Sequence, residues 1–169
     1  VTRSWKVPSE DDESNYSAYY CSVNWGKEVL FLNLETESDQ AIVHDLVREA
    51  DIVISNFRQT SAQRLRMDYN TLRAINPELI YGQITGFGED DNRPAFDVVL
   101  QAEAGFLYMT GAPEGDPVKM PVALIDLLAA HQLKEGILIA LLKRERTGVG
   151  SYLSVSLFEA AVASLANQA

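Results

Sequence analysis

Cysteine, histidine and basic charge are all scarce in this sequence of 169 residues, and each shortage excludes a class of function. The single cysteine, Cys21, leaves no internal disulfide, so we expect a reducing compartment and a cytoplasmic protein. The two histidines, His44 and His131, lie far apart and show no metal-ligand spacing, which predicts no bound metal. A formal net charge of -10 argues against non-specific binding to nucleic acid or to an anionic membrane.

Motifs of nucleotide-binding and hydrolytic enzymes are also missing. No G-x-G-x-x-G fingerprint and no Walker loop is present, so neither dinucleotide nor triphosphate binding is indicated. Neither histidine has a serine or cysteine partner in a recognisable motif, which leaves a catalytic triad unsupported. No apolar run is long enough to cross a membrane, because polar residues between His131 and Glu135 interrupt the most apolar segment.

Short apolar runs alternate with helical patterns in the first part of the chain. The expected strands are 29–34, 51–55 and 79–84, and the expected helices are 36–50 with Ser38 as N-cap, 61–67 and 69–75. Strands that alternate with helices form βαβ units, so the predicted fold class is α/β, a Rossmann-like parallel sheet with flanking helices. Ligands of such sheets bind beyond the carboxyl ends of the strands, which directs attention to residues 33–36, 56–60 and 85–93.

The most apolar segment, residues 122–146, reads as one long helix that follows Pro121 and ends at Thr147-Gly148. Apolar residues surround almost its whole circumference, so we expect it to be buried. Residues 96–108 are expected to form a helix, and a strand at 152–156 precedes a last helix. We expect a single partial domain over 1–169, with a surface loop or arm at 1–28, βαβ units at 29–95 and these helices at 96–169.

Asp126 is a lone carboxylate between Ile125 and Leu127 at the start of the long helix. A carboxylate between apolar residues requires hydrogen bonds, a helix N-terminus or a chemical role. Two interpretations are open. Aspartate near a helix start commonly complements the helix dipole, and this segment alone favours that structural role over a catalytic one.

Candidate ligand-binding residues follow the expected strands. Arg58, Arg64 and Arg93 carry guanidinium forks that suit phosphates, although each alone is more often a solvated surface residue. Asn56 and Phe57 could place an amide and a ring beside a base or a pantetheine arm, and the alternative is a turn asparagine and a core aromatic.

From Thr2 onward the chain resembles the class III CoA-transferases, the family of the carnitine and bile-acid CoA-transferases and of formyl-CoA transferase. The segments that carry the resemblance are T-R-S-W (2–5), N-W-G-K (24–27), L-N-L-E (32–35), D-I-V-I-S-N-F-R (51–58), L-R-A-I-N-P-E-L-I-Y-G-Q-I-T-G-F-G (72–88), R-P-A-F-D-V-V-L-Q-A-E-A-G (93–105) and R-T-G-V-G-S-Y-L-S-V-S-L-F (146–158). The resemblance implies an incomplete large domain, without the family's first strand and helix and without its second half. It also implies a homodimer, which is interlocked in complete members of the family.

The resemblance further implies the roles of individual residues. Asp126 falls where the family has its catalytic aspartate, the nucleophile that becomes an aspartyl-CoA thioester. The implied contacts to coenzyme A are Leu32, Asn33, Leu34 and Glu35 at the adenosine part, Asn56, Phe57 and Arg58 in a second loop, Arg64 at a phosphate, and Arg93, Pro94, Ala95 and Phe96 beside the pantetheine. The family often has a lysine at the place of Glu35. The implied substrates are an acyl-CoA and a carboxylic acid, with no metal, nucleic acid or membrane.

Two other functions remain open at this stage. The α-methylacyl-CoA racemases share the fold and have a second carboxylate that matches Asp126. At the position of Phe96-Asp97 they use a histidine just before an aspartate, and the phenyl ring of Phe96 cannot transfer a proton. Transferase is therefore favoured over racemase. The other alternative is an inactive CoA-binding fragment.

Overall fold

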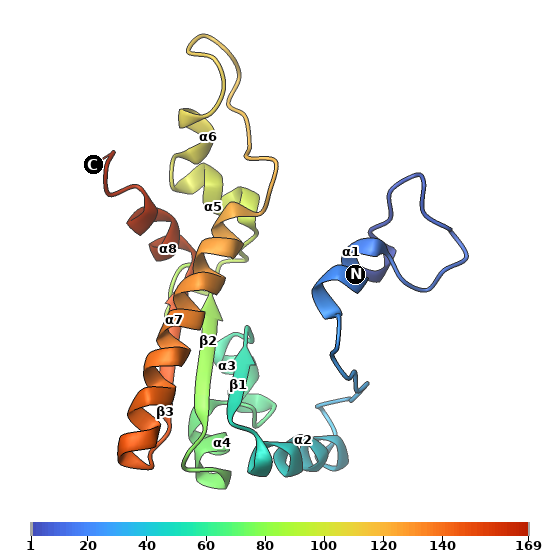
Figure 1. Ribbon diagram of the computed structural model, residues 1–169, viewed down its shortest axis with the longest axis vertical. Coiled ribbons are helices and arrows are strands. Elements are labelled where there is room, and N and C mark those ends of the chain that lie inside the picture. The colour runs from blue at the N-terminus through green and yellow to red at the C-terminus, as the bar shows by residue number, and fades with distance from the viewer. Residues whose placement is uncertain (1, 169) are drawn as a thin grey trace. The chain divides into compact units, whose positions relative to one another are not determined.

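The computed structural model describes residues 2–168, and the chain divides into two compact units, Val1–Leu32 and Asn33–Ala169. The first unit contains a short 3-10 helix, η1 (Thr2–Ser4), and one α-helix, α1 (Ala18–Asn24). The second unit contains a sheet and its helices. In chain order these elements are α2 (Glu37–Glu49), β1 (Ile52–Ser55), α3 (Gln59–Arg64), α4 (Tyr69–Ile75), β2 (Ile80–Thr85), α5 (Asp97–Glu103), α6 (Phe106–Met109), α7 (Leu124–Thr147), β3 (Ser151–Ser156) and α8 (Leu157–Ser164) (Figure 1).

The first unit is organised around two cationic side chains. The guanidinium group of Arg3 donates to the hydroxyl of Tyr20 at 2.7 Å and lies 4.1 Å from the centroid of its ring. The centroids of the Tyr16 and Phe31 rings lie 4.7 Å and 5.8 Å from the same group, so Arg3 contacts three aromatic rings. The ammonium group of Lys6 donates to three main-chain carbonyl oxygens of residues 11–14. The acidic segment 10–13 therefore belongs to a loop that folds around a lysine.

The expected strand at 29–34 is wrong. This segment has no regular secondary structure, and the side chains of Val29, Leu30 and Phe31 are exposed. A strand forms only where a neighbour accepts and donates its backbone hydrogen bonds, and within residues 2–168 no strand pairs with this segment. The sheet of the described chain begins at β1.

The three strands of the second unit form a parallel sheet in the order β1-β2-β3. In the register, Ile52 of β1 pairs with Ile80 of β2, and Ile80 pairs with Ser151 of β3. Helices α3 and α4 connect β1 to β2, and helices α5 to α7 connect β2 to β3. This arrangement confirms the predicted α/β fold with a parallel sheet and flanking helices.

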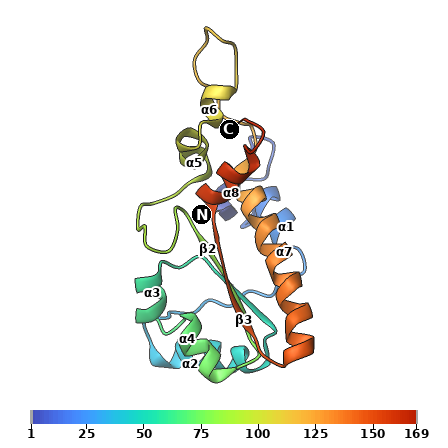
Figure 2. The ribbon, with the colours of Figure 1, turned by 90° about the vertical axis from the view of Figure 1, so that its left-hand side faces the viewer.

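Helices cover both faces of the sheet, because alternate residues of β2 point to opposite sides. Ile80 packs with Leu133 and Ile137 of α7 on one face. Tyr81 packs with residues of α2 and α4 on the other face, and its hydroxyl donates to the carbonyl oxygen of Met67 at 2.9 Å. Figure 2 shows α7 on one side of the strands and α3 and α4 on the other. The second unit is therefore three-layered, with the carboxyl ends of all strands at one edge.

Several helix boundaries depart from the sequence prediction. Thr36, and not Ser38, caps α2, because its hydroxyl accepts from the amide of Asp39. Helix α3 begins at Gln59, two residues before its expected start at Ser61. The single helix expected over 96–108 is divided into α5 and α6, because Gly105 adopts a left-handed conformation with φ of 85° between them.

Helix α7 is confirmed as one long helix, and Gly148 ends it in a left-handed conformation with φ of 66°. Its expected burial on all sides is wrong. One stripe faces the sheet and α8, and its members are Ile125, Ala129, Leu133, Ile137 and Ala140. The opposite side, with Leu127, Leu138, Ile139 and Leu142, is exposed. Within residues 2–168, no helix combines the length and the apolar character that a membrane crossing requires.

Candidate active site

A cavity of about 790 Å³ lies at the carboxyl ends of the strands. Its wall is formed by the loop after β1, by the loop after β2, and by the first turns of α7. Both loops were singled out from the sequence, since parallel strands present their carboxyl ends at one edge. The predicted site residues that line this cavity are Asn56, Phe57, Arg58, Arg93, Pro94, Ala95, Phe96 and Asp126.

The Asp126 side chain lines this cavity, is exposed to solvent and has no partner among the described residues. Within the part of the chain that the structure describes, no hydrogen bond or ion pair holds it. Partial burial raises the pKa of the Asp126 carboxyl above its ordinary value, and the negative charge of Asp97 raises it further. An unpaired carboxylate that is partly removed from water is more basic, and a more basic carboxylate is a better nucleophile.

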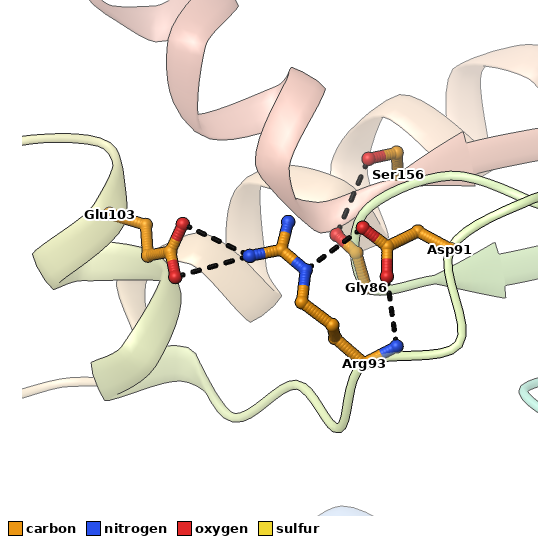
Figure 3. Close-up of polar contacts among 5 residues, drawn as sticks. All are labelled: Gly86, Asp91, Arg93, Glu103 and Ser156. Carbon is orange, nitrogen blue, oxygen red and sulfur yellow. Dashed lines mark hydrogen bonds and ion pairs between the residues drawn. The ribbon is translucent and has the colours of Figure 1, made fainter.

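The loop after β2 is braced by Arg93 (Figure 3). Its Nε donates to Asp91 at 2.9 Å, its Nη1 lies 3.3 Å from a carboxylate oxygen of Glu103, and its guanidinium lies 3.8 Å from the centroid of the Phe87 ring. The main-chain amide of Arg93 also donates to Asp91, and these bonds lower the pKa of the Asp91 carboxyl. Two carboxylates therefore already neutralise Arg93, which favours a structural role for its guanidinium over a phosphate contact.

The start of the same loop is tied to the junction of β3 and α8. The carbonyl oxygen of Gly86 accepts from the Ser156 hydroxyl at 3.3 Å (Figure 3). It also accepts from the main-chain amide of Phe158 at 2.9 Å. Further along, the carboxylate of Glu89 accepts from the Tyr152 hydroxyl at 2.5 Å. Burial and this carboxylate together raise the pKa of Tyr152, so the phenol stays protonated. The loop after β2, which forms one wall of the cavity, is thus held at Gly86 and at Glu89.

The loop after β1 supplies an aromatic ring and an unpaired cation. The side-chain amide of Gln83 donates to the carbonyl oxygen of Phe57 at 3.0 Å. The main-chain amide of Phe57 donates to the Ser55 hydroxyl at 3.2 Å. Arg58 follows at the N-cap of α3, and within residues 2–168 its guanidinium has no hydrogen bond or ion pair. Arg58 is therefore available to an anion in the cavity, unlike Arg93.

The remaining predicted contacts do not line the cavity. Leu32 belongs to the first unit, whereas Asn33, Leu34, Glu35 and Arg64 belong to the second. The carbonyl oxygen of Leu34 accepts from the side chain of Gln40 at 2.8 Å, which ties this segment to α2. Glu35 forms an ion pair with Arg64, so a ligand phosphate would have to compete with a carboxylate for that guanidinium.

The sequence analysis missed Asp97 and Gln101, which contact the start of α7. The Asp97 carboxylate accepts from the amides of Ile125 and Asp126, and the side chain of Gln101 bonds to both Asp97 and the segment before the helix. No local signal indicated this cap, because the helix was expected to begin at residue 122, whereas α7 begins at Leu124 and its N-cap is Ala123, which has no side-chain oxygen. Nothing in the local pattern identified the residue that supplies the cap.

Comparison with known proteins now places this geometry in a family. The profile of CoA-transferase family III matches residues 1–169. The chain belongs to that family. It is 38% identical over 173 residues to the succinate–glutarate CoA-transferase of Agrobacterium fabrum, covering 99% of this chain and 43% of that protein. It is 41% identical over 153 residues to the acetyl-CoA:oxalate CoA-transferase of Acetobacter aceti, covering 88% of this chain and 39% of that protein.

The fold agrees with solved structures of the family. A crystal structure of a CAIB/BAIF family protein from Brucella suis superposes with a TM-score of 0.89 at 36% identity, covering 99% of this chain and 45% of that one. The family predicted from the sequence motifs is therefore confirmed. The chain spans less than half of the length of these relatives.

Proposed function

We propose that a complete subunit containing this chain transfers coenzyme A from an acyl-CoA to a carboxylic acid, with Asp126 as the nucleophile. Membership of CoA-transferase family III supports the transfer of CoA. The observation that supports Asp126 is its unpaired carboxylate, which lines the cavity beyond the carboxyl ends of the strands. No other carboxylate of this cavity combines a raised pKa with a position at the start of the central helix.

The proposed reaction proceeds through two kinds of covalent intermediate. The Asp126 carboxylate attacks the thioester carbonyl, the carbon–sulfur bond breaks, and a mixed anhydride and a CoA thiolate result. The thiolate then attacks the aspartyl carbonyl, which releases the first carboxylate and leaves an aspartyl-CoA thioester. The acceptor carboxylate attacks this thioester, and the same two steps in reverse order give the new acyl-CoA and restore Asp126.

The surroundings of Asp126 suit this chemistry. Water would hydrolyse both the anhydride and the thioester, so the site has to exclude water from the reacting groups. Phe57, Phe96, Ala129 and Leu157 supply apolar lining of the cavity. Arg58 is the wall cation that we propose to hold a negative charge of the substrate.

The racemase alternative finds no support in the cavity. A racemase needs a second group that can exchange a proton at the α-carbon, and Phe96 stands where the racemase histidine would be. The acids that react are proposed only by class. Relatives named for succinate, glutarate, mesaconate and oxalate make small dicarboxylic acids the first acceptors to assay.

Trapping the covalent intermediate tests the proposal. The complete subunit is incubated with succinyl-CoA and then treated with hydroxylamine or borohydride, and the peptide that contains Asp126 is analysed by mass spectrometry. We expect a modification at Asp126 that requires acyl-CoA, is absent from Asp126→Asn and persists in Asp116→Asn, a matched change in the exposed loop before α7. Modification of a different residue would overturn the mechanism.

We also propose that the complete protein is a homodimer, which size measurements in solution test. We propose a cytoplasmic location for it.

A further inference from the structure

We propose that Asp97 is a positioning residue for Asp126, because it caps the N-terminus of α7 from a different helix. The inference rests on the proposed function, in which Asp126 is the nucleophile. Its physical basis is a set of hydrogen bonds between α5 and the first turn of α7.

The first amides of α7 have no acceptor in their own helix. The first four N–H groups of any helix lack an intrahelical partner, and the side chain at the N-cap normally accepts from the second or third of them. Ala123 occupies the N-cap of α7 and has no side-chain oxygen. One oxygen of Asp97 accepts instead from Ile125 at 2.7 Å and from Asp126 at 3.1 Å, the second and third residues of the helix.

Gln101 fixes the orientation of the Asp97 carboxylate. It lies one turn later on α5, is only 1% exposed, and donates its amide hydrogens to the other oxygen of Asp97 and to the carbonyl oxygen of Val122. Its own oxygen accepts from the amide of Met120 at 2.8 Å. Every polar atom of this side chain therefore connects α5 to the five residues before Ile125, and the carboxylate cannot rotate without breaking a bond.

These bonds determine where the nucleophile lies. The main-chain nitrogen of Asp126 is itself bonded to Asp97, so the carboxylate of Asp126 starts from an atom that α5 holds in place. Phe96, which precedes Asp97 as the N-cap residue of α5, lines the same cavity. Asp97 thus couples the cavity wall to the nucleophile. A displacement of about 1 Å at a reacting group can cost about a hundredfold in rate.

Two variants separate positioning from general stability. Asp97→Ala removes both acceptor bonds, whereas Asp97→Asn keeps one oxygen that can accept from the same amides. Asn76→Ala is the matched control. It removes the side-chain bonds from Asn76 to the carbonyl oxygens of Val47 and Ala50, which join α4 to α2 outside the lining of the cavity.

The first readout is hydrogen exchange of individual amides in this chain. Ile125 and Asp126 depend on Asp97 for their acceptor, so Asp97→Ala should abolish their protection while amides at residues 133–140 keep theirs. Asp97→Asn should retain most of the protection, and Asn76→Ala should leave it unchanged. Equal protection of both amides in wild type and in Asp97→Ala would overturn the capping interaction.

The second readout is the kinetics of the complete subunit. Asp97→Ala should lower kcat about a hundredfold with little change in KM for acyl-CoA, and Asp97→Asn should recover at least about tenfold of that loss. Asn76→Ala should alter neither constant. If Asp97→Ala does not fold, the positioning role is tested with Asp97→Asn, by its kcat and by the exchange rates of its Ile125 and Asp126 amides. Unchanged kcat in Asp97→Ala, in a subunit that Asp126→Asn inactivates, would overturn the positioning role alone, whereas activity in Asp126→Asn would overturn the proposed function.

Discussion

Ala95 lies so close to Gly86 that a Cβ atom built on Gly86 would come within 2.3 Å of the Ala95 Cβ. The two residues stand at opposite ends of the loop that follows β2, so the loop closes on itself at this point. Phe96 and Asp97 follow Ala95 directly. Phe96 lines the cavity, and the Asp97 carboxylate accepts hydrogen bonds from main-chain amides of α7. The shape of the cavity therefore depends on the absence of a single methyl group.

The variant Gly86→Ala should push Ala95 away and destabilise the protein by about 1–3 kcal/mol, the usual cost of an overpacked contact. The double variant Gly86→Ala/Ala95→Gly should recover most of this loss, because the added methyl group would then lie 3.7 Å from the Cα of residue 95. Unfolding in urea measures both. Failure of the second change to restore stability would show that contact with Ala95 is not the cause.

Two other glycines should respond to alanine in opposite directions. Gly136 lies inside α7, and an added Cβ would lie 3.6 Å from a methyl group of Leu153, which is an ordinary contact. Gly136→Ala should therefore stabilise the protein by about 0.5–1 kcal/mol through helix propensity. Gly150→Ala should destabilise it by about 1–3 kcal/mol or more, since the new Cβ would lie 2.0 Å from the carbonyl oxygen of Leu79. Thermal unfolding of the two variants checks the pair, and a lower midpoint for Gly136→Ala would contradict the prediction.

The raised pKa of Asp126 predicts that this carboxylate lowers stability at neutral pH. A carboxyl whose pKa is higher in the folded than in the unfolded state favours folding when it is protonated, and this benefit is lost as pH rises through the folded pKa. Asp126→Asn should therefore be more stable than wild type at pH 7. The advantage should shrink as the pH falls through the range just above the ordinary value of 3.8 and vanish below it. Denaturant midpoints of wild type and Asp126→Asn across this range test the sign.

The ion pair between Glu35 and Arg64 predicts an effect on the affinity for coenzyme A. Exposed pairs of this kind contribute about 0.2–1 kcal/mol, so freeing Arg64 by Glu35→Gln should tighten binding by a factor of about 1.4 to 5 if a ligand phosphate takes the place of the carboxylate. Asp45→Asn is the control, because it makes the same charge change by breaking the exposed pair with Arg48. Calorimetric titration with CoA should show a gain only for Glu35→Gln. An equal gain in both variants would attribute the effect to net charge.

The elements that could be predicted from the sequence are those that depend on their own residues. Helix α4 was expected at 69–75 and is observed at Tyr69–Ile75, with Asp68 as its N-cap and Pro77 shortly beyond its end. The apolar runs that became β1, β2 and β3 were found within one or two residues. In these segments the local pattern and the final contacts agree.

The wrong predictions share a different cause, which is dependence on groups far along the chain. Residues 29–34 have the composition of a strand, but a strand exists only with a neighbour, and composition does not provide one. The outer side of α7 is as apolar as the inner side, so periodicity could not tell which part the sheet covers. The cap supplied by Asp97 joins residues separated by 28 positions or more, and no local rule reaches that distance.

The candidate site was predictable as a location more than as a set of interactions. The loops after β1 and β2 and the start of α7 do meet at one cavity, as the rule for parallel sheets implies. The sequence did not indicate that Arg93 would be held by Asp91 and Glu103, since guanidinium groups pair with whichever carboxylates the fold brings near. The roles of these residues toward coenzyme A remain predictions.

The exposed side of α7 has a practical consequence for anyone who purifies this chain. Leu138, Ile139 and Leu142 are 54%, 67% and 60% exposed and lie on neighbouring turns, with Leu127 further along the helix at 53%. An exposed apolar strip of this kind binds hydrophobic dyes and promotes self-association even when the protein is fully native. Dye-monitored melting curves should therefore begin from a bright baseline, and sulfate salts should promote precipitation of correctly folded molecules.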